Sequence, residues 1–401
     1  MRLFRKEKLW RAHPLKNSYD VVIVGAGVHG LGIAYYLASQ HGMRRIAVLD
    51  KGYLGCGNSG RNTAIVRSNY RTPQGIALYD ASLKLYEGLS QELGWNMLLS
   101  QRGHLTLAHT DSAIAGLRLR AENNQAMGVD SRLIFPEEIH RLAPALNLKA
   151  FMPVLAALHH PPGGIIRHDA VVRGYAQGCD RYEVEIHPYT EVTGIRVRDN
   201  KAETVVTTRG EISAGAVVNA TAGWASTISQ MAGVHLPIVT FPLQACVTES
   251  LQPFLDQVVV SASLHVYFSQ TDKGDLVIGT EIDPYQSYSY RATLPTLEQM
   301  ASYTVELLPM VHGLRVIRQW TGPCDMTPDF APIIGRAEEV ENFFQDVGWG
   351  TWGFKAGPSA AKFTAELIAT NKTPEVIQPF SPARFYAGKL VGEKAAAAVS
   401  T

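Results

Sequence analysis

The chain has 401 residues, 46% of them hydrophobic and 18% charged, with 37 Lys and Arg against 36 Asp and Glu. This near-neutral balance gives no reason to expect nucleic acid or a membrane surface as partner, and no apolar run approaches the roughly 18 residues that span a bilayer. Four dispersed cysteines without a C-x-x-C pair suit reduced thiols in the cytoplasm better than a disulfide or zinc framework. We therefore expect a soluble globular protein of two domains.

The first 18 residues are predicted to form an arm. The segment Met1 to Lys16 is rich in Lys and Arg, holds the single acid Glu7, and lacks the apolar core of a secretory signal. Two interpretations stay open: a solvated arm, or an arm that lies on a partner subunit.

A strand–turn–helix–strand pattern follows the arm. The apolar run Val21 to Val24 predicts a buried strand, residues 31–40 predict a helix, and the apolar run Ile46 to Leu49 predicts a second strand that ends on Asp50. Between the first strand and the helix lies the glycine-rich segment Gly25 to Gly30. The spacing of these parts is typical of a site for an ADP-containing cofactor rather than a chance glycine-rich turn.

Each part of this fingerprint has a physical role. Gly25 permits the tight turn, Gly27 lets a pyrophosphate approach the backbone, and Gly30 lets the helix pack closely on the sheet. The helix start offers unpaired N–H groups and a positive dipole end to the phosphates. Asp50 is placed to accept hydrogen bonds from a ribose hydroxyl.

The remaining elements alternate between strand and helix patterns. In chain order we expect a Gly/Ser/Asn loop over 52–62, a helix over 74–93, a strand over 103–108, short helices over 121–128 and 136–142, strands over 184–195, a hairpin that turns at Gly210, a buried strand and tight turn over 216–224, a β-rich stretch over 238–279, a helix over 296–308, and a loop and helix over 346–370. The Ala-rich end, 395–401, is predicted to be frayed.

Strand–turn signals at both ends and in the middle of the chain indicate a nucleotide-binding domain built from separate segments, with a second domain inserted between them. We predict an α/β fold in which a Rossmann-like domain carries a substrate domain based on a mostly antiparallel sheet. The predicted boundaries are 19–97, 160–230 and 322–387 for the nucleotide-binding domain, 98–159 and 231–321 for the substrate domain, and 388–401 for a tail.

Six stretches, in this order, resemble the glycine/D-amino-acid oxidase flavoprotein superfamily, and within it the family of β subunits of heterotetrameric sarcosine oxidases. They are Gly25 to Leu31, Gly60 to Tyr70, Ser100 to Gly103, Arg167 to Asp169, His265 to Tyr267, and Gly348 to Lys355. The resemblance implies non-covalent FAD at the fingerprint and covalent FMN on a histidine. It also implies a larger α-type subunit that binds NAD and folate, and small γ- and δ-type subunits. The aromatic residues Trp349, Trp352 and Phe354 near the end of the chain, usually a sign of packing, are offered with the basic arm as support for such partners.

The implied reaction is the oxidation of a secondary amino acid such as sarcosine by hydride transfer to FAD. The imine would give glycine and formaldehyde or a folate adduct, and electrons would pass to FMN and then oxygen. Alternatives are the same chemistry on N-methylglutamate, proline or an opine with another acceptor, or a non-catalytic nucleotide-binding subunit. Arg67, His265 and Lys355 argue against the last, because a degenerate subunit has no reason to place charge in apolar segments. An NAD-dependent dehydrogenase would not explain the later flavin-family stretches.

The candidate substrate residues are Arg67, Lys355, His265 and Tyr267. Arg67 lies in an apolar stretch and Lys355 in a Gly/Trp-rich turn without a nearby acid; by resemblance they form a clamp for the substrate carboxylate, against the alternative of a structural salt bridge or flavin contact. Lys355 beside a flavin would also steer oxygen or stabilise reduced flavin. His265 and Tyr267, two apart in a strand pattern, are expected on one face, where they either contact substrate or form a core pair.

The same resemblance predicts the contacts of both flavins. For FAD the expected residues are Gly25, Gly27, Gly30, Asp50, Lys51, Arg61, Asn62, Thr63, Val192, Gly223, Gly350, Gly353 and Lys355.

The resemblance implies the second flavin, FMN, on His168, within the segment Gly164 to Asp169. A histidine suits this role, because a neutral imidazole nitrogen can attack the 8-methyl carbon of an oxidised flavin. Asp169 would orient the ring and Arg167 would offset anionic charge. The alternative is a polar helix start at Arg167 to Asp169. His104, His159 and His160 lack metal-ligand spacing, so they are interpreted as structural and no metal site is predicted.

Overall fold

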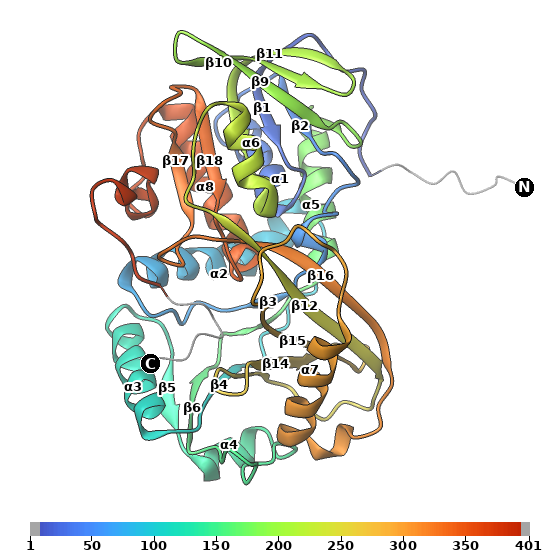
Figure 1. Cartoon of the computed structure of the whole chain (residues 1–401), viewed down its shortest axis with the longest axis vertical. Coiled ribbons are helices and arrows are strands. Elements are labelled where there is room, and N and C mark those ends of the chain that lie inside the picture. The colour runs from blue at the N-terminus through green and yellow to red at the C-terminus, as the bar shows by residue number, and fades with distance from the viewer. Residues whose placement is uncertain (1–8, 394–401) are drawn as a thin grey trace, which may run out of the picture.

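The structure, a computed structural model, describes residues 9–393, and two large β-sheets divide them into the upper and lower halves of Figure 1. The first sheet contains the fingerprint. Its strands, in spatial order, are β17 (Ile333–Arg336), β18 (Phe343–Val347), β11 (Gly210–Asn219), β1 (Ser18–Val24), β2 (Ile46–Leu49) and β8 (Glu185–His187), with β10 (Lys201–Thr207) and β9 (Val192–Arg198) continuing from β11. The five strands from β18 to β8 run parallel, which confirms the Rossmann-like prediction.

The central strands of this sheet are apolar on both faces, so both faces must be covered. Helices cover one of them. Val21 and Ile23 of β1 face the helices α1 (Val28–Ser39), α2 (Pro73–Leu93), α5 (His168–Arg181) and α8 (Gly353–Thr370). Val22 and Val24 face the opposite side, where β9, β10 and α6 (Ala225–Met231) complete a second cluster.

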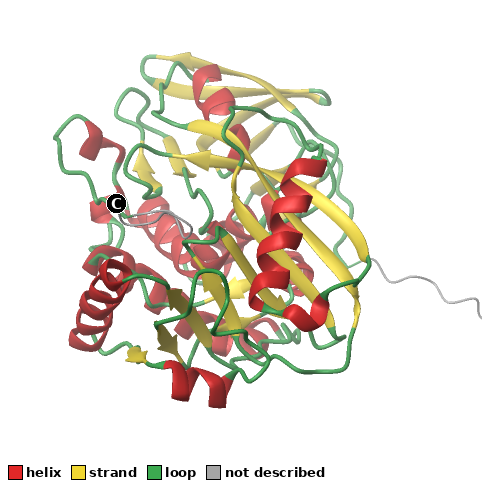
Figure 2. Cartoon of the chain, turned by 60° about the horizontal axis from the view of Figure 1, so that its bottom comes forward, coloured by secondary structure: helices red, strands yellow, loops and turns green. Residues whose placement is uncertain are grey.

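The second sheet forms the lower half of Figure 1 and is mostly antiparallel, as predicted. Its order is β16 (Val316–Met326), β12 (Val239–Ser250), β15 (Asp275–Ile282), β14 (Val266–Gln270), β13 (Val258–Ser261), β4 (His104–Ala108), β6 (Ala156–His160) and β5 (Arg132–Ile134). Helix α7 (Leu294–Leu307) lies across one face in Figure 2, and α3 (Asp111–Ala126) and α4 (Pro136–Leu142) lie near β5 and β6. The exact domain boundaries stay a prediction.

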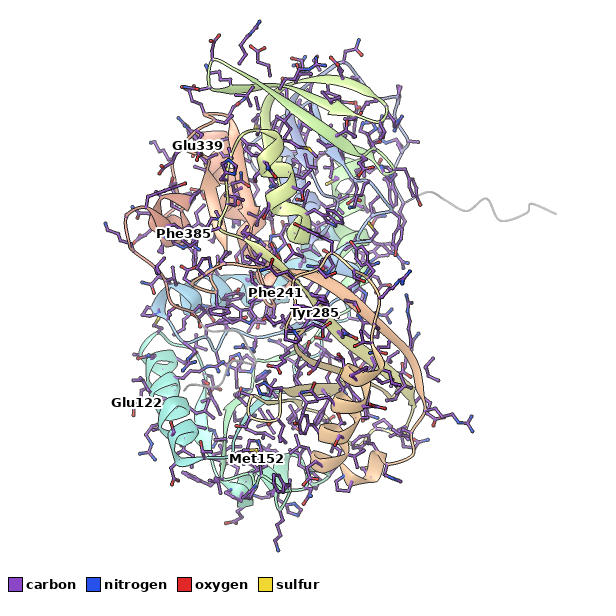
Figure 3. All side chains as sticks on the ribbon, viewed as in Figure 1. Glu122, Met152, Phe241, Tyr285, Glu339 and Phe385 are labelled. Atoms are coloured by element: carbon purple, nitrogen blue, oxygen red, sulfur yellow. The ribbon has the colours of Figure 1, made fainter. Side chains whose placement is uncertain are left out.

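The two halves meet along the long strands β12 and β16 and a two-stranded ribbon, β3 (Ile65–Val66) with β7 (Gly164–Ile165). Figure 3 shows Phe241, from β12, and Tyr285 near this junction. The face of the second sheet that carries Leu105, Val259 and Phe268 packs into its own apolar core. Since side chains alternate along a strand, the opposite face, which carries Tyr267, is left to face the first half.

Several element predictions were wrong in their limits. The short helix expected over 121–128 is the end of α3, which begins at Asp111; only Ala121 and Asn124 of α3 are buried, so an apolar periodicity is nearly absent. The hairpin turns at Thr208 and Arg209, since Thr207 pairs with Gly210. The strand expected from 216 begins at Gly210 as part of β11. Helix α1 begins at Val28 rather than at residue 31.

Strand β16 was not predicted, because Gly322 and Pro323 interrupt its pattern. It lies at the edge of the second sheet, where a proline is tolerated because one side of the strand needs no ladder partner.

The described part of the arm lies on its own chain. Arg11 pairs with Asp180 at 3.1 Å and Lys16 pairs with the buried Glu185. Near the other end, buried Arg384 pairs with Asp329 at 2.8 Å, and Glu393 accepts the N–H groups of Arg71 and Thr72. Residues 1–8 and the Ala-rich end, 395–401, lie outside the described residues. No helix within residues 9–393 is long and apolar enough to cross a bilayer.

Candidate functional site

A cavity lies at the carboxyl edge of the first sheet, where the parallel strands β1, β2 and β11 end, and the second sheet closes it from the other side. This edge is the usual ligand position in open α/β sheets. The predicted site residues that line the cavity are Gly25, Gly27, Asp50, Lys51, Arg61, Asn62, Thr63, Val192, Tyr267, Gly350, Gly353 and Lys355. Gly30, Arg67, His168, Gly223 and His265 do not line it.

The fingerprint has the close backbone contacts that its glycines predict. Gly25 has a φ of 110°, and a Cβ there would lie 2.4 Å from the Ala220 carbonyl oxygen. A Cβ on Gly30 would lie 1.9 Å from the Gly25 carbonyl oxygen, so Gly30 serves the packing of α1 on the turn rather than the cavity wall. The first turn of α1 contains no acidic residue, which leaves its positive end free to attract an anion.

Asp50 ties the second strand to this turn. Its carboxylate accepts the N–H of Ala26 and the N–H of Gly52, each at 2.8 Å. The same side chain lines the cavity, so its remaining acceptor capacity faces the space that a ribose would take.

The loop after β2 joins the first half to the second. Asn58 donates to the Pro323 carbonyl at 2.6 Å, and Trp320 donates to the Arg61 carbonyl at 2.7 Å. Ser59 accepts the N–H of Val28 at 2.9 Å, which brings this loop against the start of α1. Gly223 has a packing role here, because a Cβ on it would meet Pro323 at 2.6 Å, while its neighbours Ala222 and Trp224 line the cavity.

Arg67 and Lys355 form a cationic pair beside the cavity. Arg67 is 7% exposed; its guanidinium donates to the carbonyl and side-chain oxygens of Asn69, both at 3.0 Å, and lies 4.3 Å from the Tyr70 ring centre. Burial, aided by the charge of Arg67, lowers the pKa of Lys355 to about 7. Within residues 9–393 neither cation forms an ion pair with a carboxylate. The structural salt bridge offered as their alternative role is therefore absent from the described chain.

The expectation that His265 and Tyr267 share a strand face is wrong. His265 precedes β14 with a φ of 49°, and its Nδ1 lies 2.9 Å from the Glu281 carboxylate. Tyr267 alone lines the cavity, and burial raises its pKa to about 12, so it is a neutral phenol there.

His168 is the first residue of α5, so the helix-start interpretation describes its local structure. Asp169 pairs with Arg167 and Arg173 rather than with the imidazole. Burial lowers the pKa of His168, which keeps the ring neutral. The preceding ribbon touches the cavity wall, because the N–H of Ile166 donates to the carbonyl of the lining residue Ala64 at 3.0 Å.

The residues present fit an ADP-containing flavin. Besides the glycine cradle and the helix start, three buried side-chain oxygens that line the cavity lack hydrogen-bond partners: those of Asn58, Asp325 and Thr351. Sequence reasoning missed His29, Trp224 and Asp325 as lining residues. His29 occupies a variable position inside the fingerprint, Trp224 comes from the turn after β11, and Asp325 comes from the unpredicted strand β16; the sequence does not reveal the neighbours of the last two in space.

Comparisons with known proteins agree with the interpretation of this cavity as a flavin site. The family model described as FAD dependent oxidoreductase matches residues 20–367. Sarcosine oxidase subunit beta of Rhodobacter capsulatus is 41% identical over 98% of this chain and 95% of its own length. The protein of the same name from an Arthrobacter species is 42% identical over 98% of each chain. A crystal structure of L-proline dehydrogenase from P. horikoshii superposes with a TM-score of 0.87 at 29% identity, covering 94% of this chain and 100% of that one.

Replacing Gly27 by valine is expected to abolish FAD binding. A Cβ at this position would lie 2.8 Å from the Ser59 hydroxyl, and the branched side chain would take the space of the pyrophosphate. The measurement is the flavin-to-protein ratio of the purified variant. As control, Gly210→Val has open space around its Cβ, although its φ of 125° strains that turn, and should keep its flavin. Full FAD occupancy in Gly27→Val would show that the fingerprint is misread.

Proposed function

The chain belongs to the FAD-dependent oxidoreductase family, and we propose that it oxidises a secondary amino acid such as sarcosine as the β-type subunit of a hetero-oligomeric enzyme. The observation that carries this proposal is the cationic pair Arg67 and Lys355, which lies beside the cavity without a carboxylate of its own. Arg67 is buried and Lys355 is half-buried, and charges withdrawn from water in this way require a partner. An amino-acid substrate brings one, because its carboxylate matches the guanidinium fork and the ammonium point charge.

In this function FAD supplies the two-electron acceptor for the hydride of the substrate C–H bond. The protein fixes the substrate through Arg67 and Lys355, and Tyr267 forms part of the wall opposite the fingerprint. Water would hydrolyse the resulting imine to glycine and formaldehyde, or a folate partner would take its carbon. FMN, when bound, would supply the route for the two electrons to oxygen, which would become H2O2. Besides binding the substrate carboxylate, Lys355 has two further roles in this proposal: to steer oxygen to the flavin or to stabilise the reduced flavin.

A second candidate keeps the chemistry and changes the substrate. The likeness to a structure titled L-proline dehydrogenase favours a test of proline, and N-methylglutamate and an opine belong in the same panel. The rate of flavin bleaching with each amine would rank them.

Arg67→Met and Lys355→Met should each lower kcat/KM for the amino acid by roughly 10- to 150-fold, equivalent to about 1.5–3 kcal/mol for a lost charge-assisted contact. For the wild type, kcat/KM for an N-methyl amine without a carboxylate should be lower than for the amino acid by a similar factor. With that amine, neither substitution should lower kcat/KM any further. Arg318→Met, at an exposed position of β16, is the control and should leave both rates unchanged. Equal wild-type rates with and without the carboxylate would contradict the clamp.

Carboxylate affinity is expected to fall with rising pH. Lys355 has a pKa lowered to about 7, so it is mostly charged at pH 6 and mostly neutral at pH 8. Only the charged form attracts the ligand, and the apparent Kd should therefore rise by up to about tenfold per pH unit above 7. The probe is acetate, which carries no titrating amine, and the measurement is its effect on the flavin absorption spectrum. Lys355→Arg, which stays charged, should show a flat profile; a flat wild-type profile would contradict the assignment.

Partner subunits are proposed from the names of the relatives, each called subunit beta. The proposed set is a larger α-type subunit that binds NAD and folate and small γ- and δ-type subunits. The two supports seen in the sequence are weaker in the structure. The described arm pairs with Asp180 and Glu185 of its own chain, and Trp349 and Trp352 are buried.

We expect this chain expressed alone to lack turnover with oxygen and to regain it when co-expressed with the partner subunits. Size-exclusion chromatography of the active fraction provides the measurement. A clean preparation of the single chain that oxidises substrate with oxygen would defeat this proposal.

Covalent FMN on His168 remains part of the proposal, supported by a neutral ring and by the contact of its ribbon with the cavity wall. Acid precipitation of the purified complex should leave a yellow pellet, and His168→Ala should lose that colour while retaining FAD. Peptide mapping checks the site. His312→Ala, an exposed histidine, is the control. Release of all yellow colour from the wild type, with an unmodified His168 peptide, would rule out the attachment.

A further inference from the structure

His29 lies at the FAD cavity between the start of α1, Trp349 and the start of α8. It belongs to the first turn of α1, its ring packs 4.6 Å from the Trp349 ring centre, and it lines the cavity. Its side chain is 12% exposed, and the Asp346 side chain beside it is completely buried.

Both ring nitrogens of His29 face groups that only accept hydrogen bonds. Nδ1 lies 3.0 Å from the Asp346 carboxylate and Nε2 lies 2.8 Å from the Gly353 carbonyl. A nitrogen must carry a proton to donate, so the two contacts together require the imidazolium form. Burial lowers the pKa of His29, but Asp346 and the Gly353 carbonyl outweigh burial and raise it.

The partners of His29 fix the turn that leads to Lys355. Asp346 also accepts from the Trp349 indole at 2.7 Å, and Asp325 accepts the N–H of Gly348 at 2.6 Å. Gly353 begins α8, two residues before Lys355. The next carbonyl, that of Phe354, is held from outside the helix, because Pro358 has no N–H to offer and the Tyr86 hydroxyl donates instead at 2.5 Å.

We propose that His29 is a positioning residue: its imidazolium joins the phosphate-binding start of α1 to the first turn of α8 and thereby holds Lys355 in place. The inference rests on the proposed role of Lys355 in binding the substrate carboxylate. It adds a link between the nucleotide site and the substrate site that runs through the side chain of His29.

A double-mutant cycle in the purified holoenzyme tests the link. The variants are His29→Gln, Lys355→Met and the combination, and the probe is acetate, titrated against the flavin absorption spectrum. His29→Gln should raise the Kd of acetate at least about fivefold and should raise KM for the amino acid more than it lowers kcat. In the Lys355→Met background the same substitution should change the Kd less than about twofold. An equal factor in both backgrounds would show that His29 does not act through Lys355.

Tyr86→Phe provides a second variant outside the cavity, in case His29→Gln fails to hold FAD. It frees the Phe354 carbonyl without touching the nucleotide site, and its effect on acetate affinity should likewise disappear in the Lys355→Met background. Persistence of that effect would overturn the inference. His312→Gln, at an exposed position, is the matched histidine control. If Lys355→Met alone leaves acetate affinity unchanged, the clamp itself is wrong, which separates failure of the proposed function from failure of the His29 link.

Discussion

The site depends on the close approach of three backbone segments at the end of β1. The turn at Gly25 lies against Ala220 at the end of β11, α1 lies against the turn through Gly30, and Asp50 at the end of β2 bonds the N–H of Ala26. These contacts leave no space for a side chain at the two glycines. They bring three strand ends and one helix start to a single edge, so the positive end of the helix dipole lies at the cavity. The remaining lining is arranged around this edge.

The second constraint is electrostatic. Arg67 follows β3 and donates to the carbonyl and amide oxygens of Asn69, Lys355 lies in the first turn of α8, and neither forms an ion pair with a carboxylate within the described residues. Burial first, and the like charge of Arg67 second, disfavour the charged form of Lys355 and lower its pKa. An anionic ligand would relieve this repulsion and supply the missing countercharge, so the same arrangement that costs stability in the free protein favours binding of an amino acid. By contrast, His29 has its countercharge built in as Asp346.

The two halves have separate sheets and cores, but several turns bond one half to the other. Loop residues Asn58 and Arg61 follow β2 but bond β16 of the second sheet, while Asp325 of β16 bonds the turn at Gly348 before α8. Tyr86 of α2 reaches the Phe354 carbonyl. Nucleotide and substrate positions are thus defined by a shared set of turns. The relatives match over nearly the whole chain rather than over the fingerprint alone.

The sequence by itself determined the local features: the apolar runs of β1 and β2, the glycine turn, α2, α4 and β4, and the family resemblance in six short stretches. Each of these features depends on residues that lie close together in the sequence, so the pattern of residue types predicts it. Only the tertiary structure decided that His265 leaves its strand to meet Glu281, that β16 forms an edge around Pro323, and that Arg67 and Lys355 share a neighbourhood without a carboxylate. It alone revealed His29 between Asp346 and Gly353, more than 300 residues away along the chain. Such contacts depend on packing between distant segments, and short-range periodicity carries no information about them.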